Sequence, residues 1–108
     1  MRDLPPLLVT IDWAARVATV AVHGELDSVT RSQVMERLAW VLEGRPRQLV
    51  LDLLGVADRF ADQAVTIIAA ARDQLPPGCL LEVRSASPAV RSALQAAEWS
   101  GVRISTGP

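Results

Sequence analysis

The chain has 108 residues, which predicts one domain over residues 1–108. Half of the residues are hydrophobic and 21% are charged, a balance typical of a folded chain rather than a disordered one. The formal net charge is −1 and every basic residue is an arginine, so the sequence offers no basic surface for nucleic acid.

No segment approaches the roughly 20 apolar residues that a membrane-spanning helix needs. Residues 1–6 contain an acidic residue and two prolines where a signal peptide would have its apolar run. With one cysteine and one histidine, the chain has neither an internal disulfide nor a Cys/His metal site. We therefore expect a cytoplasmic protein without a membrane span, a metal or a cofactor.

The first elements in chain order are two strands, at residues 7–12 and 17–22, joined as a hairpin by a loop at 13–16. A break at residues 23–28 follows, in which Asp27 or Ser28 is the natural N-cap of a helix. The apolar face of that helix and the glycine that ends it are Val34, Leu38, Val41, Leu42 and Gly44.

The second half alternates strands and helices. Residues 48–54 form a near-continuous apolar run, typical of a strand covered on both faces or central in a largely parallel sheet. We then expect a polar loop at 57–63, a helix to about residue 75, a strand at 79–83, a helix opened by Ser87-Pro88, and a last strand at 102–105. The inward positions of these two helices are Ala64, Ile68, Ala71 and Leu75, then Val90, Leu94 and Ala97.

The predicted order is β-β-α-β-α-β-α-β, beginning with an N-terminal β-hairpin. A strand, a helix and a parallel strand cross over right-handedly in nearly all proteins. Crossovers that advance in one direction place their helices mainly on one face of the sheet. The fold class is therefore α/β, with a mixed sheet.

The sequence holds little that points to catalysis. It has no glycine-rich phosphate loop, and a nucleophile–base pair would need His23, which we interpret as structural or exposed. Cys79 is interpreted as a small buried residue. Trp13, Trp40 and Trp99 are interpreted as lids on the core in preference to partner contacts. We expect no catalytic residue and no enzyme activity.

Four carboxylates, those of Glu25, Asp27, Asp58 and Asp62, follow strands of the predicted sheet. The carboxyl ends of parallel strands meet at one edge, where open α/β sheets usually bind ligands. Asp27 and Asp62 are equally well explained as helix N-caps. Capping and binding are compatible, so both interpretations stay open.

Three segments together resemble the STAS domain family of bacterial anti-sigma factor antagonists and sulfate-transporter domains. They are Gly24-Glu25-Leu26-Asp27, Leu49-Val50-Leu51-Asp52-Leu53 with Gly55-Val56, and Ser87-Pro88-Ala89-Val90-Arg91. The resemblance covers about residues 7–105, the expected core of the domain. It implies a switch protein that binds an anti-sigma factor, usually a serine kinase of the histidine-kinase-like ATPase fold. That kinase phosphorylates a serine at the start of the second helix, in a loop commonly reading Asp-Ser-Ser-Gly.

The sequence departs from the family at this loop. Aligned without gaps from Gly55-Val56, the motif falls on Phe60, Ala61, Asp62 and Gln63, which makes Asp62 the phosphosite equivalent. A gap of two residues instead places Asp62 on the aspartate of the motif and Ala64 on its second serine. Neither alignment leaves a hydroxyl group at the site, and we prefer the ungapped one.

The resemblance thus predicts a regulatory protein-binding module of signal transduction, in which an anti-sigma factor antagonist controls transcription. The expected partner-binding residues are Glu25, Asp27, Ser28, Asp58, Arg59, Phe60 and Asp62. The alternative is a scaffold or subunit that pairs with other STAS proteins, with itself as a homodimer, or with a transporter. A third possibility, an enzyme or a small-ligand sensor, has no supporting group of residues.

Overall fold

The computed structural model describes residues 7–99 and 101–105. Its elements in chain order are β1 (Leu7–Ala14), β2 (Val17–Gly24), α1 (Thr30–Glu43), β3 (Gln48–Val56), the 3-10 helix η1 (Asp58–Phe60), α2 (Ala61–Asp73), β4 (Leu80–Arg84), α3 (Pro88–Ala97) and β5 (Val102–Ser105). This order confirms the predicted alternation of strands and helices. The expectation about a signal peptide concerns residues 1–6, which lie outside the described residues.

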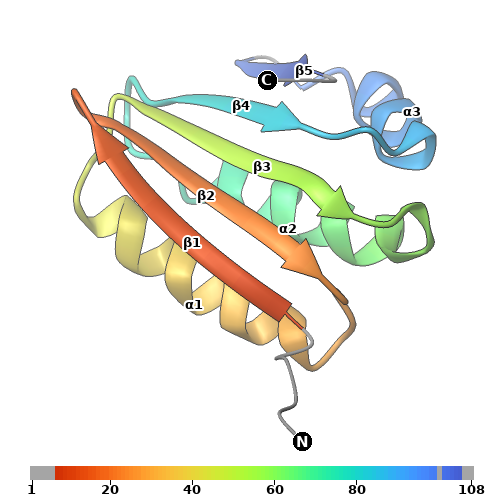
Figure 1. The fold of residues 1–108 in the computed structure, drawn as a ribbon. Coiled ribbons are helices and arrows are strands. Elements are labelled where there is room, and N and C mark those ends of the chain that lie inside the picture. The colour runs from red at the N-terminus through yellow and green to blue at the C-terminus, as the bar shows by residue number, and fades with distance from the viewer. Residues whose placement is uncertain (1–6, 100, 106–108) are drawn as a thin grey trace, which may run out of the picture.

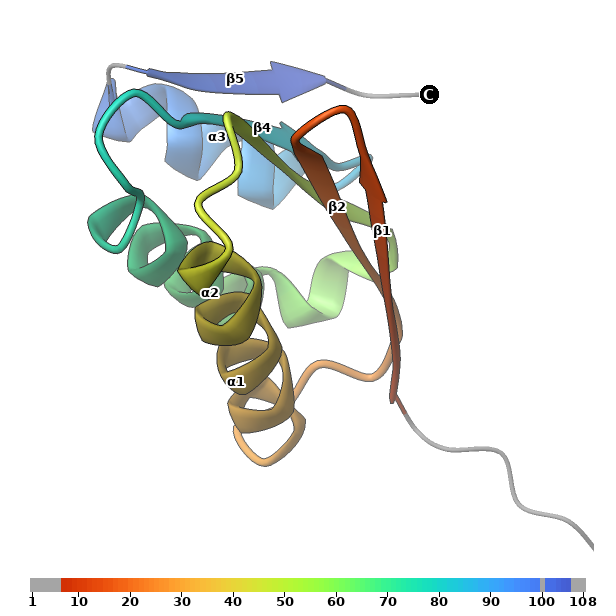
Figure 2. The same ribbon diagram turned by 90° about the vertical axis from the view of Figure 1, so that its left-hand side faces the viewer.

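The strands form one five-stranded sheet in the order β1-β2-β3-β4-β5 (Figure 1). β1 pairs with β2 in antiparallel fashion, and every later pair is parallel. Figure 2 shows α1, α2 and α3 together on one side of this sheet. The mixed sheet and its one-sided helical layer are therefore as predicted, and the opposite sheet face carries no helix of the described chain.

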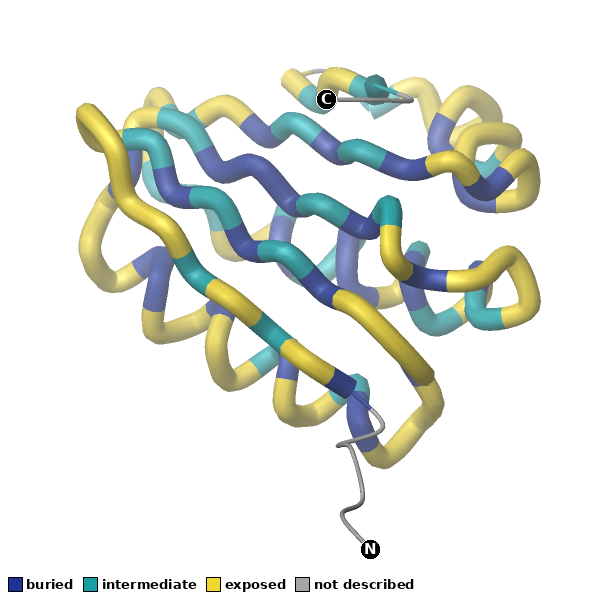
Figure 3. Tube along the Cα trace, viewed as in Figure 1, coloured by how far each residue is buried: buried dark blue, intermediate teal, exposed yellow. Residues whose placement is uncertain are grey.

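The core lies between the sheet and the three helices. Alternate residues of β2 and β3, such as Val22 and Leu51, have no exposed surface and point toward the helices. Ile67 and Ile68 of α2 are also fully buried beneath the sheet. Figure 3 shows the resulting alternation of buried and half-buried positions along β2, whereas in β3 the outward-facing Val50 is buried as well. Ile67 was not among the predicted inward positions, and it widens the apolar face of α2.

The hairpin is tighter than the predicted four-residue loop. Ala15 and Arg16 alone form the turn, with φ of 51° and 67°, the left-handed pair of values that matches the twist of two-residue hairpins. Trp13 therefore lies in β1, where it pairs with Ala18. Its indole packs against Gly44, where an added Cβ would lie 3.0 Å from the ring.

Several element ends differ from the predictions. η1 and the first turn of α2 occupy the predicted 57–63 loop, and α2 ends at Asp73, so Leu75 lies beyond it. Ser87 caps α3 as predicted, accepting the Val90 amide at 3.2 Å. Ala97 is exposed, in contrast to its predicted inward position, because α3 ends there and Glu98 turns the chain with a left-handed φ of 50°.

The three tryptophans differ in burial. Trp99 packs against the core, with the Arg72 guanidinium 5.2 Å from its ring, as expected of a lid. Trp13 is 42% exposed and Trp40 is 60% exposed. Trp40 was wrongly expected to cover the core, because its position on α1 points to solvent between the buried Leu38 and Val41.

Candidate functional site

The carboxyl ends of the parallel strands β2, β3 and β4 lead into the starts of α1, α2 and α3 at one edge of the molecule (Figure 1). We call this region the helix-start edge and define it as residues 25–31, 57–63 and 85–89. All seven predicted partner-binding residues lie in its first two segments. They differ in what their side chains do.

Asp27 is bound by the backbone of its own loop. Its Oδ1 accepts the amide hydrogens of Val29 at 2.9 Å and of Thr30 at 2.8 Å. In return, the Thr30 hydroxyl oxygen accepts the amide hydrogen of Asp27 at 2.9 Å, which makes a reciprocal capping box. These bonds, led by the one from the Thr30 amide, hold the pKa of Asp27 below its ordinary value of 3.8. Of the two predicted caps, Asp27 makes capping hydrogen bonds to the start of α1 and Ser28 does not, although the residue directly before the helix is Val29.

Thr30 completes this loop and was missed by the sequence analysis. It is 4% exposed, and its hydroxyl donates to the backbone carbonyl of Glu25 at 2.8 Å. The signal was its spacing of three residues from Asp27, which is the capping-box spacing. Glu25 and Ser28 have exposed side chains beside it. The loop after β2 is therefore a self-bonded turn that presents two free polar side chains.

Asp58 joins η1 to the start of α3. Its Oδ1 accepts a hydrogen bond from the Ser87 hydroxyl and another from the Ala89 amide at 3.3 Å. Ser87 is 6% exposed, and its own amide donates to the Ser85 hydroxyl at 3.1 Å. The carboxylate of Asp58 is thus engaged within the molecule. Nothing local in the sequence pointed to this contact, because it spans 29 residues.

Arg59, Phe60 and Asp62 present their side chains differently. The Arg59 guanidinium stacks 4.8 Å from the centre of the Phe60 ring and forms a cation–π pair with it. Arg59 is exposed and Phe60 is half-buried. Asp62 is exposed in the first turn of α2, where the helix dipole favours negative charge. The N-cap position belongs to Phe60, so the interpretation of Asp62 as an N-cap is wrong. Among the described residues, nothing donates a hydrogen bond to the Asp62 carboxylate.

A side-chain bridge brings the first two segments of the edge together. The Arg31 guanidinium of α1 donates to Oε1 of Gln63 in α2 at 2.8 Å. Both residues are half-buried, and neither was singled out from the sequence. With the Asp58–Ser87 contact, this bridge links the starts of all three helices. The helix-start edge is therefore a connected surface, with Asp62 as a free carboxylate beside the bridge.

His23 and Cys79, the two side chains considered for catalysis, both lie outside the helix-start edge. His23 is exposed on β2, and its imidazole lies so close to Gly55 that a Cβ there would overlap it. Cys79 is half-buried ahead of β4, and burial raises the pKa of its thiol, which disfavours the reactive thiolate. Within residues 7–99 and 101–105, no group of three metal-ligating side chains gathers. In the same residues, no helix has the length and apolar character to cross a membrane.

Comparisons with known proteins match this architecture. A family model described as Mlab, STAS domain matches residues 9–104. An anti-sigma factor antagonist from Mycobacterium paratuberculosis has a similar structure, with a TM-score of 0.76 and 21% identity over 94% of this chain and 86% of that one. The anti-sigma factor antagonist SpoIIAA in its unphosphorylated form has a TM-score of 0.59 and 12% identity over 92% and 89% of the two chains. No curated protein sequence matches the chain. At these identities the structural likeness is one of fold.

Proposed function

The chain belongs to the STAS domain family, and we propose that it is a non-catalytic antagonist of an anti-sigma factor, acting in transcription control. The proposal is supported by the α/β fold shared with two anti-sigma factor antagonists. The observation that carries it is the set of exposed polar side chains on the helix-start edge, at the carboxyl ends of the parallel strands.

The proposed partner is an anti-sigma factor of the serine-kinase, ATPase-fold class, and the proposed contact surface is the helix-start edge. We propose that the side chains exposed or only partly buried at this edge contact the partner directly. They are Glu25, Ser28, Arg59, Phe60 and Asp62. Asp27 and Asp58 contribute by shaping the edge, because their carboxylates are bound within the molecule. Phe and Arg are both enriched in protein-binding surfaces, so the Arg59–Phe60 pair supports a contact surface here.

Asp62 gives the surface a permanent charge where a phosphorylatable side chain would give a switchable one. A phosphoserine carries about two negative charges and three acceptor oxygens, whereas an aspartate carries one charge and two oxygens. Asp62 is thus only a partial and constant imitation of the phosphorylated state, and we propose that its single charge permits partner binding, which the larger charge of a phosphoserine would end. We therefore propose that partner binding by this chain is not controlled by serine phosphorylation at the start of α2.

The test is affinity capture from the native cell lysate with the wild-type chain and with Asp62→Ser and Asp62→Arg as baits. The matched control is Asp73→Arg, which makes the same charge change on an exposed aspartate at the other end of α2. We expect an ATPase-fold kinase to be recovered by the wild-type and control baits. Its recovery should change with both Asp62 variants.

Purified kinase and ATP then provide a second measurement. Asp62→Ser restores a hydroxyl at the site, so we expect the kinase to phosphorylate this variant and then to release it. The wild-type chain should remain unmodified and bound. Recovery of a kinase that binds all four baits equally would place the interface elsewhere and contradict the proposed surface.

A second candidate is a subunit that pairs with other STAS proteins or with a transporter. It is favoured by the absence of a hydroxyl at residues 60–63, since a constitutive subunit needs no phosphorylation switch. The same capture experiment separates the two functions. Recovery of STAS or transporter proteins without a kinase, and with no dependence on Asp62, would support the subunit.

A further inference from the structure

No helix of the described chain covers the sheet face opposite α1, α2 and α3, although Val50 at its centre is only 3% exposed. This face consists of the alternate residues of each strand that point away from the core, from Leu8 of β1 to Arg103 of β5. Leu8 and Leu80 are 52% and 55% exposed on it. We call this surface the open face.

The charges on the open face follow the strand register. One row crosses the sheet as Asp12, Thr19, Val50, Glu82 and Arg103, because each of these residues pairs with the next. An acidic residue thus stands on the β1 edge and a basic residue on the β5 edge, with an apolar residue at the centre. Asp12 and Arg103 are both exposed.

We propose that the open face binds a second copy of this chain, with the two-fold axis parallel to β3. Such an axis lays β1 of one copy over β5 of the other. Asp12 then faces Arg103 of the second copy, and the reverse pair forms at the opposite edge. Val50 lies beneath the axis, where it is only 3% exposed, and Glu82 meets a Thr19 hydroxyl. Aligned packing of this kind is usual for two sheets stacked face to face, at about 10 Å.

The neighbouring row is compatible with the same axis. It reads Thr10, Ala21, Asp52, Arg84 and Ser105 across the sheet. The axis brings the two Asp52 residues together, and it also places an Arg84 on each side of them. Each Arg84 already pairs with Glu82 of its own chain at 3.0 Å, so the two guanidinium groups offset only part of the charge of the two Asp52 carboxylates. A two-fold axis perpendicular to the strands and along the first row would instead oppose Asp12 to Asp12 and Arg103 to Arg103, and these like charges disfavour it.

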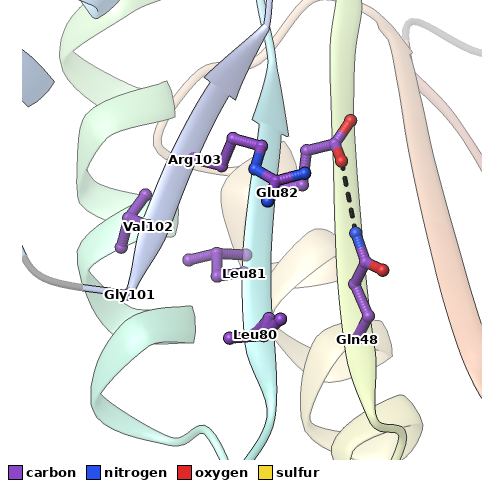
Figure 4. A pocket seen from close by; sticks show the side chains of 7 residues that line it. All are labelled: Gln48, Leu80, Leu81, Glu82, Gly101, Val102 and Arg103. Atoms are coloured by element: carbon purple, nitrogen blue, oxygen red, sulfur yellow. Dashed lines mark hydrogen bonds between the residues drawn. The ribbon is translucent and has the colours of Figure 1, made fainter.

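The shape of the open face agrees with this arrangement. A hollow of about 320 Å³ lies at the amino-terminal ends of β4 and β5, beside Leu80 and Arg103 (Figure 4). The proposed axis sets the β1–β2 hairpin end of the second copy over this hollow, with Val17 opposite Leu80. The rim of the hollow is fixed in place, because Glu82 accepts hydrogen bonds from Gln48 at 3.2 Å and from Arg84 at 3.0 Å.

The size of the face predicts a reversible dimer. Five strands spaced about 4.8 Å apart, with about six residues each at about 3.3 Å, give a face of roughly 500 Å² per copy. Two such faces bury about 1,000 Å², the lower limit for a specific interface. Because the axis preserves strand direction, both helix-start edges point the same way and stay free. The proposal is therefore independent of the proposed anti-sigma function.

Sedimentation of the full chain over a concentration series tests the dimer by charge reversal. We expect the wild-type chain to dimerise, and Asp12→Arg or Arg103→Asp alone to weaken association about tenfold, since each creates two like-charge pairs per dimer. An equimolar mixture of the two single variants should recover dimerisation, because the heterodimer restores both opposite-charge pairs. Asp73→Arg, on the helical side, is the control and should dimerise as the wild type does.

Circular dichroism melting is used to check that the variants fold. We expect them to fold, because Asp12 and Arg103 are both exposed. A chain that stays monomeric at every concentration would overturn the proposal and leave the open face to a different occupant. A dimer that is indifferent to both single reversals would overturn it as well. So would a mixture that associates no better than either variant alone, because that result removes the pairing of β1 with β5.

Discussion

The loop after β2 and the segment after β3 both bring aspartates to the start of a helix, and they use them in opposite ways. In the first, Asp27 is held by the amides of its own loop and by Thr30. In the second, Asp58 reaches across to α3, while Asp62 has no bond to its carboxylate among the described residues. Three acids in similar sequence positions thus close a loop, join two elements and remain free.

This difference separates residues that build the helix-start edge from residues that can act on a partner. A carboxylate that already accepts two or three hydrogen bonds within the molecule would lose them if it turned to a partner, and that loss would offset the new hydrogen bonds. A carboxylate without such bonds loses only its hydration. We therefore expect stability changes at Asp27, Thr30 and Asp58, and binding changes at Asp62.

The largest expected effect is at Thr30. Thr30→Val keeps the shape of the buried side chain and removes its hydroxyl, which leaves the Glu25 carbonyl and the Asp27 amide unsatisfied. We expect the free energy of unfolding to fall by about 2 kcal/mol in urea titrations. The control is Thr66→Val on the surface of α2, where the hydroxyl donates only to an exposed helix carbonyl. Equal losses in the two variants would refute the structural role of Thr30.

The second effect is at Asp58. Asp58→Ala should lower the free energy of unfolding by about 1–2 kcal/mol, because it leaves the buried Ser87 hydroxyl without its acceptor. Asp58→Asn retains Oδ1 as an acceptor, so most of the stability should remain. In a double-mutant cycle with Ser87→Ala, the two losses should not add. Additive losses, or an Asn variant as unstable as the Ala variant, would contradict the contact between η1 and α3.

Part of this structure could be predicted from the sequence and part of it could not. The strand and helix order followed from periodicity and from caps such as Ser87-Pro88, whose physical causes are local. The hydrogen bonds by which Asp27 caps the loop before α1 could be predicted for the same reason, since they involve amides within three residues. The family resemblance led to the helix-start edge, where seven residues were named.

The errors have long-range or geometric causes. The role of Asp58 depends on a contact with Ser87, and the bridge from Arg31 to Gln63 crosses between helices. Neither pairing leaves a periodic trace in the sequence. The hairpin loop was predicted two residues too long, because Ala15 and Arg16 adopt left-handed φ values without the usual glycine or asparagine. The capping role of Asp62 was wrong because the start of α2 depends on η1, a turn that the sequence suggested only as loop.

A smaller effect depends on pH. Hydrogen bonds from Thr30 and Val29 lower the pKa of Asp27 in the folded state, so folding favours the ionised carboxylate. The contribution of the Asp27 carboxylate to the free energy of unfolding is complete above its pKa in the unfolded chain, close to 3.8. This contribution is lost as the pH falls through its pKa in the folded protein. Asp27→Asn keeps an acceptor oxygen without the titration. The stability of the wild type relative to this variant should therefore be constant above about pH 5 and should fall below the unfolded pKa.

Urea titrations between neutral and acid pH provide the measurement. The other carboxylates titrate in both proteins, so their contributions cancel in the difference. A difference in unfolding free energy that stays flat down to acid denaturation would show that the Asp27 carboxylate gains nothing from its bonds. A difference that grows with falling pH would reverse the sign and contradict the capping box.

The smallest expected effect on stability is at Asp62, and it is the sharpest test of the comparison. Asp62→Asn removes only a favourable interaction between the exposed charge and the start of α2, so the free energy of unfolding should change by less than about 0.5 kcal/mol. The melting temperature should stay close to that of the wild type, whereas recovery of the proposed anti-sigma partner should change. If Asp62→Asn instead destabilises the fold as much as Asp58→Ala does, then Asp62 is a structural residue too. A stable variant with altered binding would instead show that the two aspartates after β3 have separate roles. Asp58 would then stabilise the contact between η1 and α3, and Asp62 would contact the partner.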